Sequence, residues 1–179
     1  YNNLIVIGDN TLSTNQVSVY DRNSGNLVYS LTDPEGINET NDFGDDVAIS
    51  SSYLVVGSPR YSSYRGRAYV YDAYTGAPLH TFDNPNYQSR YSNDRFGSSV
   101  AVSGDKIFVG APHEEKGIDN PFLSGNQERT DAGMMYTFNA ITGNLEHNVV
   151  NYGYNARDVR IDYFTGSGIR TSGDYVLVG

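Results

Sequence analysis

Short apolar runs recur along the chain, separated by turns rich in Gly, Ser and Asp. Consecutive apolar positions occur at residues 47–49, 54–56, 100–102 and 107–109. Runs of this length between turn residues are typical of strands covered on both faces. Tyr69 and Tyr71, and again Tyr136 and Phe138, follow the two-residue period of a strand. Since no window has the period and caps of a helix, the pattern predicts an all-β protein.

Blocks of sequence return in the same order, which indicates an internal repeat. Residues 43–50 return as residues 96–103, with Phe-Gly at the start of each copy. Residues 53–59 return as residues 106–112, and the second copy ends in Gly-Ala-Pro. Each block returns after roughly 50 residues, the length of one propeller blade.

A third block ends in a turn at Gly25, Gly76 and Gly143, because Gly adopts a positive φ without steric cost. Each unit then has four short antiparallel strands, which predicts a β-propeller of about three and a quarter blades. The units of this single domain are approximately residues 1–42 (partial), 43–95, 96–163 and 164–179 (partial).

The strand order predicts two different faces. The turns between first and second strands and between third and fourth strands are tight and share one face. The longer connections gather on the opposite face, the long-loop face, at residues 34–42, 59–66, 84–95 and 112–132. Loops on a rigid scaffold commonly carry function, so we expect binding there. Because a closed propeller needs at least four blades, we expect a segment of a larger propeller or completion by other chains.

Composition excludes several classes of function. The 179 residues contain 12 Lys and Arg against 21 Asp and Glu, a net charge of −9, which argues against nucleic-acid binding. The absence of Cys excludes disulfides and thiol metal sites. No apolar run approaches the ~20 residues of a membrane-spanning helix.

The motif pair Phe96-Gly97 and Gly110-Ala111-Pro112 resembles the FG-GAP repeat of integrin-α-type β-propellers. Residues 43–44 and 57–59 carry the same motif with Ser for Ala. The Thr-Gly turn and the Asp-Asn-Pro-Asn at residues 83–86 are similar to tandem repeats in virion and surface proteins of marine phages and bacteria. The resemblance implies adhesion or assembly at an extracellular, virion or cell surface.

Catalytic and metal-binding motifs are not expected. Calcium loops of the FG-GAP family are rich in Asp, whereas the turns at residues 50–52 and 103–105 are short and poor in carboxylates. The three histidines, His80, His113 and His147, are expected at unrelated repeat positions, with residues 113–115 in a solvated loop. The Asp-x-x-Thr-Gly turn also resembles quinoprotein dehydrogenase repeats, but the Trp residues that dock those blades are absent. We therefore expect no enzyme activity and no cofactor.

Tyr and Arg residues in the long loops are the candidate binding residues, because both types anchor interfaces at modest ordering cost. The candidates are Tyr61, Tyr64, Arg65, Tyr87, Arg90, Tyr91, Glu114, Phe122 and Arg129. Packing between blades is an equal alternative for this group. The expected partners are a protein or glycan receptor, or neighbouring subunits of a particle. Two alternative functions stay open: a purely structural virion or filament component, and the propeller of a glycan-processing enzyme.

Overall fold

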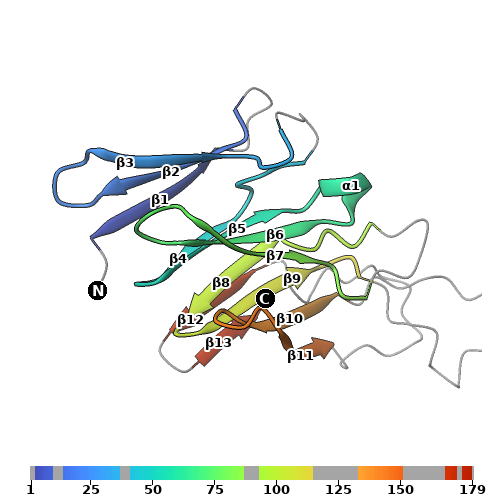
Figure 1. Cartoon of the computed structure of the whole chain (residues 1–179). Helices are drawn as coiled ribbons and strands as arrows, with labels where there is room; N and C mark the ends of the chain where they lie inside the picture. Colours follow the sequence, from blue (N-terminus) through green and yellow to red (C-terminus); the bar gives the residue numbers. More distant parts are fainter. Residues whose placement is uncertain are drawn as a thin grey trace, which may run out of the picture.

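The computed structural model describes residues 3–9, 14–36, 41–86, 93–114, 133–150, 168–172 and 175–178. In these residues four antiparallel sheets follow one another along the chain (Figure 1). The first sheet contains β1 (Leu4–Asp9), β2 (Gln16–Asp21) and β3 (Leu27–Thr32). The second contains β4 (Val47–Ile49), β5 (Tyr53–Ser58), β6 (Arg67–Asp72) and β7 (Pro78–Asp83).

The third sheet repeats the second, with β8 (Ser99–Ser103), β9 (Lys106–Ala111), β10 (Met134–Asn139) and β11 (Leu145–Val150). The last sheet pairs β12 (Ile169–Ser172) with β13 (Tyr175–Val178). In both four-stranded sheets the spatial order equals the chain order. This is the predicted arrangement of propeller blades, so the all-β prediction and the four-strand blade are confirmed. We call the sheets blades 1 to 4.

The only helical element in the described residues is α1 (Tyr61–Tyr64), between β5 and β6. Ser62 and Ser63 have φ values of 51° and 63°, so α1 is a left-handed turn and not an ordinary helix. No sequence pattern predicts this turn, because Ser and Tyr rarely adopt a positive φ.

The Phe-Gly and Gly-Ser/Ala-Pro motifs form a contact within blade 2 and within blade 3. The Gly44 N–H donates to the Gly57 carbonyl, and the Gly97 N–H donates to the Gly110 carbonyl, both at 2.9 Å. Phe43 and Phe96 are fully buried beside these bonds. The repeated motif therefore connects the start of blade 2 and of blade 3 to the second strand of the same blade.

The same glycines set the spacing between blades. A Cβ atom on Gly57 would lie 2.0 Å from the carbonyl oxygen of Gly97 in blade 3. A Cβ atom on Gly8 would meet the carbonyl of Gly44 in blade 2 at the same distance. Main chains of neighbouring blades therefore approach more closely than any side chain allows.

The same bulge interrupts the pairing of the outer strand in blades 1, 2 and 3 and fixes its register. After the bulge, Tyr29 opposes Val19 and His80 opposes Val70. In blade 3, His147 opposes Thr137. His80 and His147 therefore hold the same repeat position, and the prediction that all three histidines hold unrelated positions is wrong for this pair.

Candidate functional site

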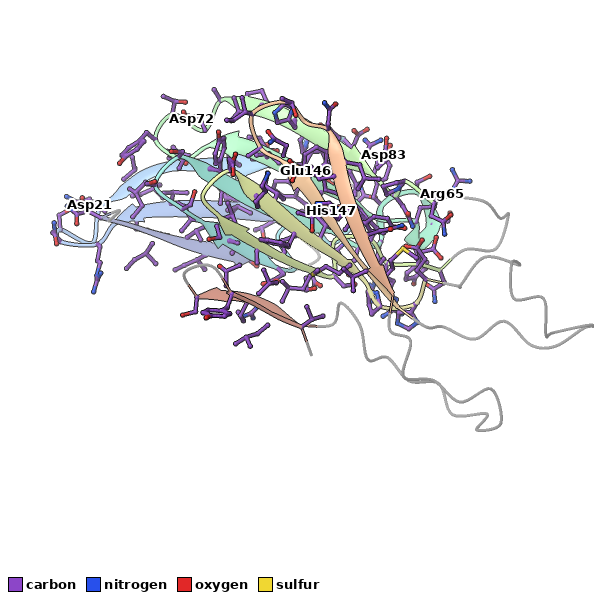
Figure 2. All side chains as sticks on the ribbon, turned by 90° about the horizontal axis from the view of Figure 1, so that it is seen from below. Asp21, Arg65, Asp72, Asp83, Glu146 and His147 are labelled. Carbon is purple, nitrogen blue, oxygen red and sulfur yellow. The ribbon has the colours of Figure 1, made fainter. Side chains whose placement is uncertain are left out.

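The described residues separate into the two predicted faces. Ala73 N–H donates to the Ser52 carbonyl at 3.0 Å, which brings the two tight turns of blade 2 together. Figure 2 shows Asp21 and Asp72, at the tight turns, far from Arg65 and Asp83, which lie at the opposite end of the strands. The longer connections of blades 2 and 3 leave from that opposite end.

Side chains explain why the tight turns keep their sequence. Oδ1 of Asp72 accepts hydrogen bonds from the Tyr74 N–H, the Thr75 N–H and the Thr75 hydroxyl. Asp21 makes the equivalent bonds in blade 1. These bonds lower the pKa of both carboxyls. The turn motif is thus accounted for by local hydrogen bonding.

The loop that contains α1 is attached to the next blade through its main chain. The Arg95 N–H donates to the Tyr64 carbonyl at 2.9 Å, and the Phe96 N–H donates to the Arg65 carbonyl at 3.2 Å. Gly66 pairs with Phe96 in an isolated bridge. The loop is therefore fixed by two blades.

The left-handed turn carries backbone strain. Ser62, Ser63 and Tyr64 have φ values of 51°, 63° and 68°. A left-handed conformation costs roughly 1–2 kcal/mol for each residue with a side chain. Strain of this kind persists where surrounding contacts impose it, and it is concentrated at functional sites.

Arginines surround the two tyrosines of this loop. The guanidinium carbons of Arg60 and Arg95 lie 5.7 and 5.5 Å from the centre of the Tyr64 ring. Arg67 lies over the Tyr61 ring at 3.8 Å. These distances fit cation–π contacts, which orient both aromatic rings. We call Arg60, Tyr61, Tyr64, Arg65, Arg67 and Arg95 the Arg–Tyr surface.

Carboxylates hold part of the Arg–Tyr surface in place. Arg60 Nε lies 2.9 Å from Asp42. Arg67 donates from Nε to Asp83 and from Nη1 to Glu35, each at 2.7 Å. A pocket of about 310 Å³ opens beside these groups. Its walls are Tyr61, Ser62, Arg65, Gly66, Arg67, Asp83 and Asn84.

Three of the predicted binding residues lie together in this region. Tyr61, Tyr64 and Arg65 belong to the one loop, and Tyr64 is 40% exposed. Arg60, Arg67 and Arg95 were missed, because the left-handed backbone at Ser62, Ser63 and Tyr64 that shapes this loop has no sequence signal. Five further candidates lie outside the described residues: Tyr87, Arg90, Tyr91, Phe122 and Arg129.

Two predictions for Glu114 are wrong: it is not an exposed binding residue, and it is not part of a solvated loop. It is 2% exposed and accepts a hydrogen bond on Oε1 from the Tyr136 hydroxyl. Nδ2 of Asn84 donates to Asp94 at 3.0 Å and to Glu114 Oε2 at 3.3 Å. Burial raises the pKa of Glu114 to about 7, although the bond from Tyr136 acts to lower it. Glu114 therefore connects blades 2 and 3.

The preceding junction has a similar pair with the residue types exchanged. There Nδ2 of Asn41 donates to Asp33 at 3.0 Å, and both residues are buried. Asp33 and Asn84 each follow an outer strand, whereas Asn41 and Asp94 each precede a Phe-Gly motif by two residues. An acid–amide pair is thus a repeated feature of the long-loop face. Acid and amide exchange places, so residue-by-residue matching of the repeats does not reveal the pair.

Both long loops between second and third strands are closed at the base by one hydrogen bond. The Gly66 N–H donates to the Tyr61 carbonyl at 3.1 Å. The Gly133 N–H donates to the Glu114 carbonyl at 3.2 Å. The two loops therefore leave the scaffold with the same geometry.

Neither a membrane-spanning helix nor a cluster of metal ligands occurs among the described residues. No helix among them is long and apolar enough to cross a membrane. Within the same residues, no group of three or more His, Asp or Glu side chains could hold a metal ion.

These features define the chain as a set of β-propeller blades with a loop-built surface at one end. Residues 90–138 match the family described as FG-GAP repeat, from before Phe96-Gly97 to Phe138 in β10. The chain therefore carries an FG-GAP repeat, as its motifs predicted. No curated protein matches the sequence.

Solved structures resemble the fold at low sequence identity. The quinohemoprotein alcohol dehydrogenase from Comamonas testosteroni is 16% identical with a TM-score of 0.51, over 83% of this chain and 19% of that one. Quinohemoprotein alcohol dehydrogenase ADHIIG from Pseudomonas putida HK5 is 15% identical with a TM-score of 0.51, over 84% and 19%. The chain thus spans about a fifth of these proteins, and the likeness shows the fold alone.

Proposed function

We propose that the chain is a non-enzymatic adhesion or assembly module, exposed outside the cell or on a virion. In this proposal the long-loop face binds a protein or glycan partner. The observation that carries it is the Arg–Tyr surface, held on a strained loop that two blades fix. Tyr and Arg contribute most of the binding energy in many interfaces, and a rigid surface loses little entropy on binding.

The carboxyls of the same face favour this role over an enzymatic one, because Asp83 and Glu35 are paired with Arg67 and two others are buried. Asp94 and Glu114 are 3% and 2% exposed, and both are engaged by Asn84. A glycan-processing propeller needs acidic groups that reach a substrate. These two acids instead support the loops that carry the Arg–Tyr surface.

The test compares two exposed tyrosines on opposite faces. Tyr64 belongs to the Arg–Tyr surface, whereas Tyr74 lies in a tight turn and is 59% exposed. Fluorescently labelled wild-type chain, Tyr64→Ala and Tyr74→Ala are applied to a glycan array and to cells. We expect Tyr64→Ala to weaken binding at least tenfold and Tyr74→Ala to leave it unchanged. Equal losses in both variants, or an absence of binding by the wild type, contradict the proposal.

A structural role is the second candidate, favoured by the inter-blade bonds that make the loop rigid. A structure of the native assembly separates the two roles. Residues 59–66 buried against neighbouring subunits indicate a structural component. The same residues at the periphery indicate adhesion.

A further inference from the structure

One side-chain contact occurs both between blades 1 and 2 and between blades 2 and 3. In each case it joins the outer strand of one blade to the next blade. The Tyr29 hydroxyl in β3 donates to the carbonyl oxygen of Ala73 at 2.7 Å. Nε2 of His80 in β7 lies 2.8 Å from the carbonyl oxygen of Ala140 and donates to it. Ala73 and Ala140 hold the same position in the turn after the third strand, and both are buried. Each outer strand thus binds the main chain of the following turn.

A turn glycine leaves room for each of these side chains. A Cβ atom on Gly76 would lie 3.0 Å from the Tyr29 ring. A Cβ atom on Gly143 would lie 2.8 Å from Nδ1 of His80. The glycine therefore serves both the positive φ of the turn and the docking of the preceding blade.

Below this contact a second position of the outer strand packs on the third strand of the next blade. Phe82 in β7 is 5% exposed and stacks on Phe138, with the ring centres 4.1 Å apart. In blade 1, Leu31 has the equivalent position and packs in the core shared with blade 2. A junction thus combines one polar and one apolar contact, two residues apart on the outer strand.

Strand β11 carries a third copy of this pair of positions, and none of the described residues packs on it. His147 has the register position of Tyr29 and His80, and Val149 has that of Leu31 and Phe82. His147 is exposed, as Figure 2 shows on β11, and Val149 is 48% exposed. The residues that form a junction are present, but nothing described lies against them.

The packing of β12 and β13 indicates which strands would lie over His147 and Val149. β12 packs on β8 and β9, and Ile169 is buried against Ala101, Phe108 and Met135. In the same way β8 packs on β4 and β5 at the preceding junction. β12 and β13 therefore occupy the first and second positions of blade 4. A third and a fourth strand added to β13 would lie over β10 and β11.

We propose that His147 and Val149 form a docking face for the hairpin of third and fourth strands that completes blade 4 beside β13. His147 donates a hydrogen bond to a main-chain carbonyl in the turn of that hairpin. The hairpin has a small residue at the position of Ala140, Gly at the position of Gly143, and an apolar or aromatic residue over Val149. Continuity with two established junctions supports this occupant over an unrelated protein.

Histidine modification tests the proposal. Diethyl pyrocarbonate is applied to the 179-residue chain alone and to the native polypeptide isolated from its source, and mass spectrometry measures the modification of each histidine. We expect His147 to react at least ten times more slowly in the native polypeptide. His80, which is already bonded to Ala140, is the internal control and is expected to be protected in both.

Cross-linking through a Val149→Cys variant of the native polypeptide then identifies the cover. Attachment to a hairpin with the Ala-x-x-Gly turn spacing supports the proposal. Equal reactivity of His147 in both samples overturns it, as does attachment to any other segment. Protection of His147 in the isolated chain that rises with concentration also overturns it, because a second copy is then the cover.

Discussion

The hydroxyl of Tyr136 donates a hydrogen bond to Glu114, a residue of the loop that leaves the strand paired with Tyr136. This bond places a carboxyl group in the interior between two blades. Asp94 lies close enough to share the Asn84 amide with it. Burial, and to a smaller degree the nearby Asp94, favours the protonated form of Glu114, and stability should therefore depend on pH.

Folding is expected to weaken as the pH rises through neutrality. The pKa of Glu114 is raised from 4.5 to about 7. The stability that the protonated carboxyl contributes to the folded state is therefore complete below about pH 4.5 and is lost as the pH rises through about 7. At 1.36 kcal/mol per pKa unit, the loss is at most about 3 kcal/mol. Urea unfolding at pH 5 and pH 8 measures it. Glu114→Gln is expected to remove most of this slope.

Glu146→Gln is the matched control for that experiment. A hydrogen bond from Lys106 lowers the pKa of Glu146, so this residue titrates below the pH window. Its substitution should leave the slope between pH 5 and pH 8 unchanged. If Glu114→Gln keeps the wild-type dependence of unfolding free energy on pH, the pKa of Glu114 is not raised and the prediction is wrong.

Removing the Tyr71 hydroxyl is expected to leave stability unchanged or to raise it. Among the described residues this buried hydroxyl has no hydrogen-bond partner, and Phe138 holds the equivalent position in blade 3. Tyr136→Phe is the contrasting variant, because it deprives the buried Glu114 of a donor. We expect it to lower the unfolding free energy by about 1–3 kcal/mol. Thermal unfolding of both variants checks the difference, and a large loss in Tyr71→Phe contradicts it.

The contact between Tyr29 and Ala73 is expected to stabilise blade 1. Tyr29→Phe keeps the ring but removes the donor, and should lower the unfolding free energy by about 0.5–1.5 kcal/mol. Tyr74→Phe on the same turn changes an exposed ring and should have no effect. Chemical unfolding followed by tyrosine fluorescence compares them. Equal stability of the two variants would show that the Tyr29 bond contributes nothing.

Gly57→Ala is expected to separate blades 2 and 3. The added methyl group would meet the main-chain carbonyl of Gly97 at 2.0 Å, and neither backbone can move without loss of the sheet. Overpacking of this kind costs about 1–3 kcal/mol, and more where backbone must shift. Gly168→Ala is the control, because nothing lies within 4 Å of its Cβ position. A wild-type melting temperature for Gly57→Ala would contradict the observed approach.

The repeats made the blades predictable, since strand period and turn residues are local properties. Phe43 and Phe96 were recognised because their neighbours return with them in the sequence. Glu114 was misplaced because its burial depends on Asn84 and Tyr136, which come from another blade and another strand. No local pattern records such a partnership.

The shared position of His80 and His147 could have been found from sequence. Each follows its turn glycine, Gly76 or Gly143, by four residues, as Tyr29 follows Gly25. Counting from the Phe-Gly motifs hides this relation, because the loops between the motifs differ in length. The Arg–Tyr surface has no such signal, since α1 depends on left-handed backbone that Ser and Tyr rarely adopt.

The hydrogen bonds that close the two loop bases have a consequence for how such blades diversify. Between the bonded residues lie four positions in one loop, Tyr61 to Gly66, and eighteen in the other, Glu114 to Gly133. The entropy of closing a flexible loop grows only as the logarithm of its length, about 0.6 kcal/mol for each doubling. By that rule the longer loop costs only about 1.3 kcal/mol more to close. A blade of this design can therefore exchange one loop for another of very different length and keep its strands in register.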